Sequence, residues 1–254
     1  MKSLQEKIKS AEDIIEQAVE KYENVGVACS FGKDSMVTVD IARDVDPNIP
    51  IFSIATIFMP DETFEYLKEM DRQLNLNTRV YIVTDEVPEL LHAKDLDVIP
   101  LPSDEFRAEA EELREKNGEP IYRTDPDECC RLLKVEPLEH ALRDLSLDAW
   151  VSGLRNTESS TRENKKPFEK RDGQVKVNPI LPFTEKEVIQ YLEENGIQLH
   201  PWYKKSINGK RYRSLGCAPC TEPVSDDGSE REGRWSWCEK TECGIHTRCP
   251  LYKD

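Results

Sequence analysis

Short apolar segments alternate with amphipathic helical segments along the first 200 residues, and this alternation limits the fold more than any other feature of the chain. Strands are predicted at residues 25–29, 50–57, 79–84, 148–153 and 175–177. Helices are predicted at residues 3–22, 36–45, 61–74, 105–118, 128–145 and 185–196. Strands that alternate with helices in this way form a mostly parallel sheet with helices on both faces. The sequence therefore predicts an α/β fold with a Rossmann-like, doubly wound sheet.

The residues from Leu215 onward, called the tail below, do not continue this alternation. Gly, Pro, Asp and Ser recur there, and the tail holds five of the eight cysteines. A segment of this composition builds no core of its own, so we expect it to lie on the α/β part of the molecule. The predicted boundary falls at residue 200, between an α/β domain over residues 1–200 and an irregular, cysteine-rich C-terminal segment over residues 201–254.

Composition excludes several classes of protein. A net charge of −15 argues against a nucleic-acid binder, which needs a basic face. No apolar run approaches the roughly 18 residues of a membrane span, and the first residues lack the apolar stretch of a secretory signal. We therefore expect a cytoplasmic protein with no membrane partner and with reduced thiols. The sequence does not determine the oligomeric state, a homo-oligomer included.

A small-residue turn joins the first strand to the next helix, in the sequence SFGKDS. In a doubly wound sheet, ligands bind where a strand ends and a helix begins, and free N–H groups at a helix start bind phosphate. The turn lacks the spacing of a Walker loop. An ordinary turn capped by Asp34 or Ser35 is the alternative. The predicted phosphate-binding residues are Ser30, Phe31, Gly32, Lys33, Asp34 and Ser35.

Two close pairs of cysteines, Cys129-Cys130 and Cys217-Ala-Pro-Cys220, indicate a shared metal site. Adjacent cysteines form only a strained disulfide with each other, but at a helix start both thiolates can face one metal. Four thiolates suit zinc or a [4Fe–4S] cluster, and the spacing does not separate the two. Coincidence between unrelated cysteines is the alternative.

Four arginines and one further cysteine complete the set of candidate site residues. Arg155 and Arg162 follow the strand at residues 148–153, so we expect them at the same sheet edge as SFGKDS. Arg231 and Arg234 flank a glycine in the tail, and guanidinium groups suit phosphate and sulfate oxygens. Cys243, with His246 close by, is a candidate nucleophile, because nearby cations lower a thiol pKa. A structural or metal-binding role for Cys243 is the alternative.

Four sequence motifs, CCRLLKVEPL, GLRNTESSTR, GCAPCTEP with REGRW, and ECGIH, together resemble the assimilatory adenylyl-sulfate reductases of the sulfonucleotide reductase family. SFGKDS resembles the PP-loop of the adenine-nucleotide α-hydrolase-like superfamily, to which that family belongs. The resemblance runs from Gly26 to His246.

The resemblance implies a chemistry for each motif. Residues 1–200 would form a nucleotide-binding PP-loop domain. The four paired cysteines would hold a [4Fe–4S] cluster, and Lys134 would link this cluster to the substrate. The four arginines would bind phosphate and sulfate oxygens. Cys243 would attack the sulfur of adenosine 5′-phosphosulfate (APS), release AMP and carry an S-sulfocysteine, which thioredoxin or glutaredoxin would resolve to sulfite in sulfate assimilation. The four cysteines favour APS over its 3′-phosphorylated form, PAPS.

Two departures from the family pattern leave alternatives open. The loop keeps a lysine, Lys33, as ATP-using relatives do. Residues 53–60 read SIATIFMP, where the family has Leu-Asp-Thr-Gly near the adenosine. An ATP-using PP-loop enzyme with an iron–sulfur cluster, of the tRNA-thiolation type, is therefore the main alternative, although the tail and the negative charge disfavour it. PAPS as substrate and a non-enzymatic redox sensor are the others.

Overall fold

A seven-stranded sheet forms the centre of the computed structural model, which describes residues 2–92, 96–171 and 173–245. The strand order is β4-β3-β2-β1-β5-β7-β6, and only β6 runs antiparallel to its neighbour. The predicted α/β fold with a mostly parallel, doubly wound sheet is confirmed. The strands are β1 (Val25–Ala28), β2 (Ile51–Ala55), β3 (Arg79–Val83), β4 (Asp97–Leu101), β5 (Ala149–Ser152), β6 (Phe168–Arg171) and β7 (Gln174–Val177).

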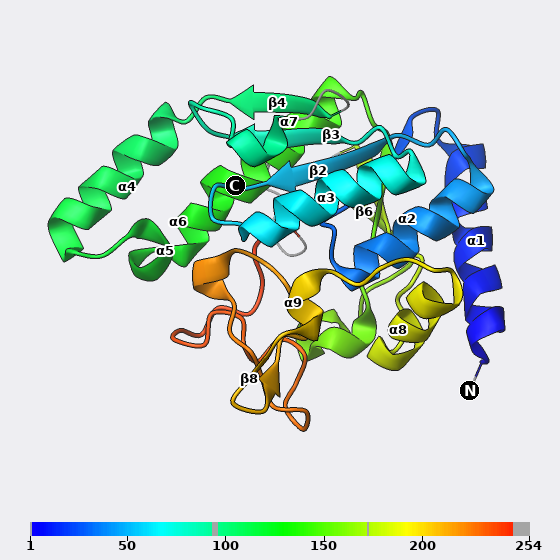
Figure 1. Cartoon of the computed structure of the whole chain (residues 1–254). Coiled ribbons are helices and arrows are strands. Elements are labelled where there is room, and N and C mark those ends of the chain that lie inside the picture. The colour runs from blue at the N-terminus through cyan, green and yellow to red at the C-terminus, as the bar shows by residue number, and fades with distance from the viewer. Residues whose placement is uncertain (1, 93–95, 172, 246–254) are drawn as a thin grey trace.

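Helices cover both faces of the sheet (Figure 1). On one face lie α1 (Leu4–Lys21), α2 (Lys33–Val45), α3 (Asp61–Leu74) and α8 (Glu185–Glu194). On the other lie α4 (Asp104–Asn117), α5 (Ile121–Thr124), α6 (Pro126–Cys130) and α7 (Glu136–Asp144). Successive residues of a strand face opposite sides, so Val80 and Ile82 pack on the first face and Tyr81 on the second.

The chain changes direction across the sheet between β1 and its neighbour β5. From β1 it moves outward through β2, β3 and β4, and it then returns to pair β5 with the other side of β1. Ligands of open α/β sheets bind beyond the carboxyl ends of the strands at such a switch point. The fold therefore places the candidate site next to the loops that follow β1 and β5.

One predicted helix is interrupted by a wider turn. Residues 128–145 were expected to form a continuous α-helix, but α6 and α7 are joined by a five-residue π-helical segment, η2 (Arg131–Val135). A π-turn holds one more residue than an α-turn and is found mostly at functional sites. It carries Lys134.

Several short elements carry no pattern that the sequence analysis recognised. These are β4, β6, α5, α9 (Pro201–Lys204) and the two-stranded hairpin β8 (Ser206–Ile207) with β9 (Lys210–Arg211). Edge strands bury little surface and so lack a strong periodic signal. The helix after SFGKDS also begins earlier than predicted, at Lys33.

The described part of the tail lies on the α/β part, as expected (Figure 1). The Ala218 N–H donates to the Phe58 carbonyl, just beyond β2, over 2.7 Å. Trp235 is 1% exposed and packs with three of the paired cysteines. Among the helices that the structure describes, none combines the length and apolarity needed to cross a membrane. The predicted domain boundary at residue 200 stays a prediction.

Candidate active site

The phosphate loop forms a tight turn between β1 and α2. Gly32 is the N-cap of α2 without any side-chain cap, so neither Asp34 nor Ser35 caps the helix as the alternative reading required. The Ser35 hydroxyl instead donates to the Gly32 carbonyl over 2.9 Å and lies 3.2 Å from the Ser30 hydroxyl. Gly153 must be a glycine because a Cβ there would lie 2.8 Å from the Ser35 backbone. The end of β5 thus packs directly on the loop.

Phe31 adopts a backbone conformation that normally favours glycine. Its φ is +56°, which costs a residue with a side chain roughly 1–2 kcal/mol. The ring is 1% exposed and belongs to the main core, and burial of a phenylalanine returns about the same free energy or more. The buried Phe31 ring therefore stabilises the backbone conformation of the loop from the side of the core.

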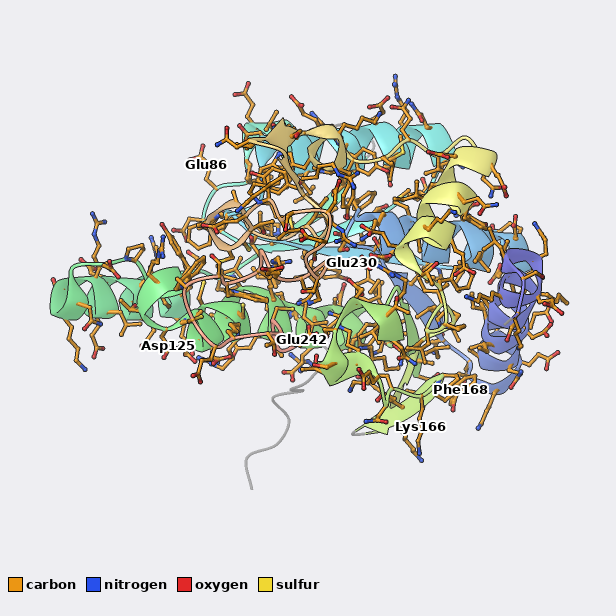
Figure 2. The ribbon with its side chains drawn as sticks, turned by 90° about the horizontal axis from the view of Figure 1, so that it is seen from below. Glu86, Asp125, Lys166, Phe168, Glu230 and Glu242 are labelled. Atoms are coloured by element: carbon orange, nitrogen blue, oxygen red, sulfur yellow. The ribbon has the colours of Figure 1, made fainter. Side chains whose placement is uncertain are left out.

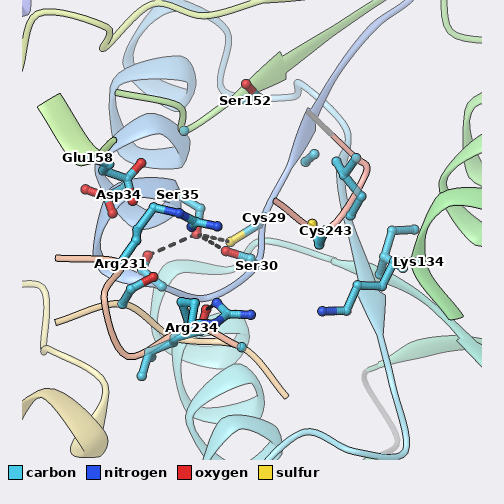
Figure 3. Close-up of a pocket in the computed structure, with 18 of the residues that line it drawn as sticks. Cys29, Ser30, Asp34, Ser35, Lys134, Ser152, Glu158, Arg231, Arg234 and Cys243 are labelled. Atoms are coloured by element: carbon cyan, nitrogen blue, oxygen red, sulfur yellow. Dashed lines mark hydrogen bonds between the residues drawn. The ribbon is translucent and has the colours of Figure 1, made fainter. Parts of the chain in front are cut away.

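A cavity of about 200 Å³ opens in front of this loop, at the junction of β1, β5 and the tail. Nine of the predicted site residues line it: Ser30, Gly32, Asp34, Ser35, Lys134, Arg162, Arg231, Arg234 and Cys243. In Figure 3, Ser30, Asp34 and Ser35 from the loop, Arg231 and Arg234 from the tail, and Lys134 beside Cys243 surround one space. Four lining side chains are cationic and two, Asp34 and Glu158, are carboxylates. The cavity is thus locally basic inside an acidic chain and suits an anionic ligand.

Lys33, Arg155 and Phe31 do not line this cavity, although the sequence placed them in the site. Arg155 is fully buried, with Nε 2.6 Å from Asp34 and Nη2 2.5 Å from Glu230 of the tail. The Lys33 ammonium lies 3.1 Å from Glu230 and donates to the Arg213 carbonyl over 2.8 Å. We call Lys33, Asp34, Arg155 and Glu230 the loop cluster. Asp34 and Glu230 therefore already form ion pairs with Lys33 and Arg155, the two cations that were expected to bind an external anion.

A second ionic group lies at the wall of the cavity. Arg162 binds Glu242 through a two-pronged contact, Nε to Oε1 at 2.7 Å and Nη2 to Oε2 at 2.8 Å. Arg162 also binds Glu158, and Arg231 donates to Glu242 over 3.1 Å. We call Glu158, Arg162, Arg231 and Glu242 the wall cluster. Figure 2 labels Glu230 and Glu242, the tail members of the two clusters, at separate points of the molecule.

Arg231 and Arg234 both line the cavity. The Nε of Arg231 is buried and has no hydrogen-bond partner among the described residues. Arg234 donates from Nε to the Cys220 carbonyl and from Nη1 to the Leu215 carbonyl, and its Nη2 forms no hydrogen bond within the described ranges. A Cβ on Gly216 would lie 2.1 Å from that Nη2, so the glycine leaves the space that the guanidinium fills. These two arginines remain candidates for binding an anion.

The four paired cysteines line a second, smaller cavity, which Lys134 and Trp235 share with the first. All four thiols are buried, and the Cys217 sulfur lies 3.3 Å from the Thr56 hydroxyl. Burial raises the pKa of Cys130 to about 11. Burial opposes ionisation of Cys217 too, but Lys134, Thr56 and Arg234 outweigh it and hold the pKa of Cys217 below its usual value.

Lys134 connects the two cavities electrostatically. Its side chain is buried, and no carboxylate of the described part of the chain forms an ion pair with it. Burial would lower its pKa, but the electrostatic interaction with Cys217, Cys130 and Cys243 raises it well above the usual value. Lys134 is therefore charged, and its role as a link between cluster and substrate stays a prediction.

Cys243 is half-buried at the cavity, and no disulfide involves it or any other described cysteine. His246, the other predicted catalytic residue, lies outside the described residues. Cys29, just after β1, also lines the cavity, and burial raises the pKa of its thiol to about 12. The sequence analysis missed Glu158, Glu230, Glu242 and Tyr203. Glu158 and Glu242 stand inside the quoted motifs, beside residues already selected, which was a usable signal.

Comparison with known proteins identifies the family of this chain. A family model described as the phosphoadenosine phosphosulfate reductase domain matches residues 24–223. The chain belongs to this family. The resemblance inferred from the sequence motifs is thereby confirmed.

Relatives of similar sequence are named as reductases, and solved structures share the fold. The chain is 33% identical to an adenosine 5′-phosphosulfate reductase of Staphylococcus epidermidis, over 96% of this chain and 89% of the relative. It is 34% identical to one of Halalkalibacterium halodurans, over 94% and 92%. A phosphoadenylyl-sulfate reductase from Candida auris has a similar fold, with a TM-score of 0.59, 20% identity, and coverage of 85% of this chain and 98% of the other. An FMN adenylyltransferase from Candida glabrata (TM-score 0.57, 15% identity, 94% and 74% covered) shares the fold alone.

Proposed function

We propose that the chain reduces APS to sulfite and AMP through a covalent intermediate on Cys243, in sulfate assimilation. Its family membership makes it an oxidoreductase that acts on a sulfur group and reduces a sulfate-activated nucleotide. The observation that carries the proposal is the cavity itself, where a half-buried thiol, a phosphate loop and guanidinium groups line one space. A sulfonucleotide offers both the anionic groups and the electrophilic sulfur that this set of residues suits.

The side chains of the cavity account for the first step. The Cys243 thiolate attacks the sulfur of APS, the bond from that sulfur to the phosphate oxygen breaks, and AMP leaves with the electron pair. Arg231, Arg234 and Lys134 stabilise the charge that develops on the leaving phosphate. Ser30, Gly32 and Ser35 offer hydroxyl and N–H groups to the same phosphate.

A dithiol reductant of the thioredoxin or glutaredoxin type completes the reaction in this proposal. One thiolate of the reductant attacks the Cys243 sulfur, and sulfite leaves with the electron pair. The second thiolate of the reductant then releases Cys243 as a thiolate and closes the disulfide of the reductant. The two electrons therefore come from the dithiol, and the sulfonyl sulfur is reduced to sulfite.

A [4Fe–4S] cluster is the metal group that we propose for the second cavity. Four thiols from two distant segments line it, which is the donor set of such a cluster. Within the described ranges, no three Cys, His, Asp or Glu side chains converge as ligands of a single ion. Four thiolates also suit zinc, and the family resemblance of CCRLLKVEPL and GCAPCTEP is what favours the cluster. Cys129, Cys130, Cys217 and Cys220 would hold it, and its charge would act on the cavity across Lys134.

The ATP-using alternative loses its main support in this arrangement. Lys33 was the residue that favoured it, and Lys33 is buried in the loop cluster outside the cavity lining. We also propose APS rather than PAPS, because the relatives at 33% and 34% identity are named as APS reductases and two carboxylates in the lining oppose an additional phosphate.

Intact mass spectrometry tests the proposed function. Protein purified without oxygen is incubated with APS and no reductant, and we expect a gain of about 80 Da, one SO₃ group. The gain should disappear in C243S and persist in C238S, which removes an exposed thiol of the same segment. Parallel incubations with PAPS and ATP identify the nucleotide. AMP release from ATP without a protein adduct from APS would refute the proposal.

Iron and sulfide analysis, together with an absorption spectrum, tests the metal group. A [4Fe–4S] cluster gives a broad absorption shoulder at about 400 nm, whereas zinc is colourless. Stoichiometric zinc in place of iron would overturn this part of the proposal and leave the adduct experiment unaffected.

A further inference from the structure

Glu242, the residue immediately before the candidate nucleophile, is the best-anchored side chain of its segment. It is 6% exposed, and its two carboxylate oxygens accept hydrogen bonds from Arg162, Arg231 and Thr161. The Thr161 hydroxyl donates to Oε1 over 3.3 Å. The Arg162 and Arg231 side chains line the cavity, whereas Glu242 does not. The carboxylate therefore lies behind the wall of the cavity and holds the two guanidinium groups from the far side.

Few other polar contacts hold this part of the tail. No backbone–backbone hydrogen bond joins residues 239–245 to the rest of the described chain. The Thr241 carbonyl accepts from Arg231 over 2.9 Å, which adds to the same anchor, and Lys240 pairs with Asp127. The remaining contacts of Cys243 and Ile245 are apolar packing. The position of Cys243 thus depends on Glu242 more than on its own backbone.

The charge on Glu242 is secure around neutral pH. Burial alone would favour the neutral acid, but the hydrogen bond from Arg162 and the charge of Arg231 outweigh it, and the pKa of Glu242 is below its usual value. The ionised carboxylate keeps both arginines in place. Only Arg162 binds it through a two-pronged contact. Arg231 binds Glu242 through Nη2, and its side chain also lines the cavity.

We propose that Glu242 is a positioning residue for Cys243: its carboxylate ties the nucleophile segment to Arg162 and Arg231 and so sets the thiol over the cavity. This inference rests on the proposed role of Cys243 in attacking APS. A thiol held at the reacting distance gains most of the advantage of an intramolecular reaction, and a displacement of about 1 Å can cost about 10²-fold in rate. The anchor matters for the attack on sulfur, whereas the later attack by a reductant needs the thiol accessible.

Single-turnover kinetics separate positioning from binding. In E242Q we expect adduct formation at saturating APS to slow about 10-fold to 100-fold, because the neutral amide no longer fixes Arg162 by a charged fork. Binding of AMP, measured by calorimetry, should be unchanged or tighter, since Arg162 is freed toward the cavity. E239Q is the matched control, because Glu239 is exposed in the same segment and forms no ion pair among the described residues. The proposal would be overturned if E242Q formed the adduct at the wild-type rate. It would also be overturned if weaker AMP binding accounted for the whole loss of rate.

Alkylation of Cys243 by iodoacetamide, followed by peptide mass spectrometry, tests the anchor without APS. E242Q and R162Q break the same link but change the local charge in opposite directions. If the link holds the segment, Cys243 should react several-fold faster in both variants and at the wild-type rate in E239Q. If charge alone sets its reactivity, E242Q should accelerate and R162Q should slow the reaction, and the proposal fails. The exposed Cys238 gives an internal reference for the alkylation rate.

Two outcomes distinguish this inference from the proposed function. Absence of an adduct in the wild-type protein would refute the proposed reaction, while the alkylation rates would still decide whether Glu242 holds the segment. Should R162Q fail to fold, as its melting curve would show, R231Q replaces it, because Arg231 contacts both Glu242 and the Thr241 carbonyl. Equal alkylation rates in wild type, E242Q and R231Q would overturn the inference.

Discussion

The loop cluster and the wall cluster are built alike and serve different ends. Each joins an arginine of the motif GLRNTESSTR to a glutamate of the tail, Arg155 to Glu230 and Arg162 to Glu242. Arg155 is wholly buried and lies outside the cavity lining, whereas Arg162 lines the cavity beside the candidate nucleophile. Two residues of one type, seven positions apart, therefore divide into a structural tie and a part of the site.

The partner, and not the arginine, determines this division. Glu230 also binds Lys33, so the loop cluster fastens the tail to the start of α2. Glu242 binds two arginines that both face the cavity. Two of the attachments of the tail are therefore buried ionic clusters, and Arg231 and Arg234 lie between Glu230 and Glu242 in the sequence. The following predictions test whether the first attachment is structural and the second functional.

Removal of Arg155 should have the largest effect on stability. R155M leaves Asp34 and Glu230 buried with only Lys33 between them, and loss of one partner of a buried ionic group costs about 3–5 kcal/mol. Urea unfolding measures the loss. R162M should also lower stability, because the buried Glu158 loses its ion-pair partner although Arg231 still binds Glu242. R162M should in addition slow adduct formation from APS, whereas R155M should leave it unchanged. Equal effects of the two variants on adduct formation would break the distinction between the clusters, as would a stable R155M with weakened nucleotide binding.

Two of the buried lysines, Lys134 and Lys33, should show opposite behaviour. K134M removes a cation from the cavity lining that no ion pair stabilises, so we expect about 10²-fold lower activity with little change in unfolding free energy. K33M removes the lysine of the loop cluster and should lower the unfolding free energy by about 2 kcal/mol with little change in activity. K210M, at an exposed lysine of β9, is the control for loss of charge. Loss of activity in K33M at unchanged stability would show that Lys33 acts on the ligand after all.

Acid should weaken the fold before it affects either cluster. Arginine and lysine neighbours outweigh burial and hold the pKa of Asp34 and Glu242 below the usual values. A carboxyl group with a lowered pKa contributes stability above the unfolded-state pKa and loses it as pH falls through the folded-state pKa, so the ion pairs of Asp34 and Glu242 persist down to about pH 4.

His200 should cause the earlier loss. Burial lowers its pKa to about 4, and its Nδ1 accepts from the Trp202 N–H while Nε2 contacts Thr63. Protonation of the imidazole would add a proton at Nδ1, so that this atom could no longer accept the hydrogen bond from the Trp202 N–H. The unfolded chain binds this proton near pH 6.5 and the folded chain does not, so stability should fall as pH is lowered from about 6.5 to about 4. Unfolding curves across this range should show the slope in the wild type and not in H200Q. The same slope in both would assign it to another group.

Much of this site followed from the sequence because its signals are local. Each of three motifs indicates its chemistry within a few consecutive residues. They are the strand–loop–helix motif, the two close cysteine pairs and the arginines around a glycine. The fold supplied what brings them together, since parallel strands end at one edge of the sheet. Nine of the predicted residues accordingly line one cavity.

The division between Arg155 and Arg162 could not be predicted, because it depends on tail glutamates 75 and 80 residues away. The burial of Lys33 has the same cause. In each case a charged side chain that suits an external anion is neutralised by a carboxylate of the same chain. Local sequence reports which groups could bind a ligand, and long-range contacts decide which groups stay free to do so.

The π-helical segment η2 imposes a strict length on the chain. Cys130 ends α6 and Lys134 lies within η2, and the wide turn places both against the second cavity. Deletion of one residue between them would restore the α-helical pitch but rotate every later residue by about 100°, which would turn Lys134 away from both cavities. A chain without Leu132 or Leu133 would keep every candidate site residue, but Lys134 would no longer face the cavities that the others line.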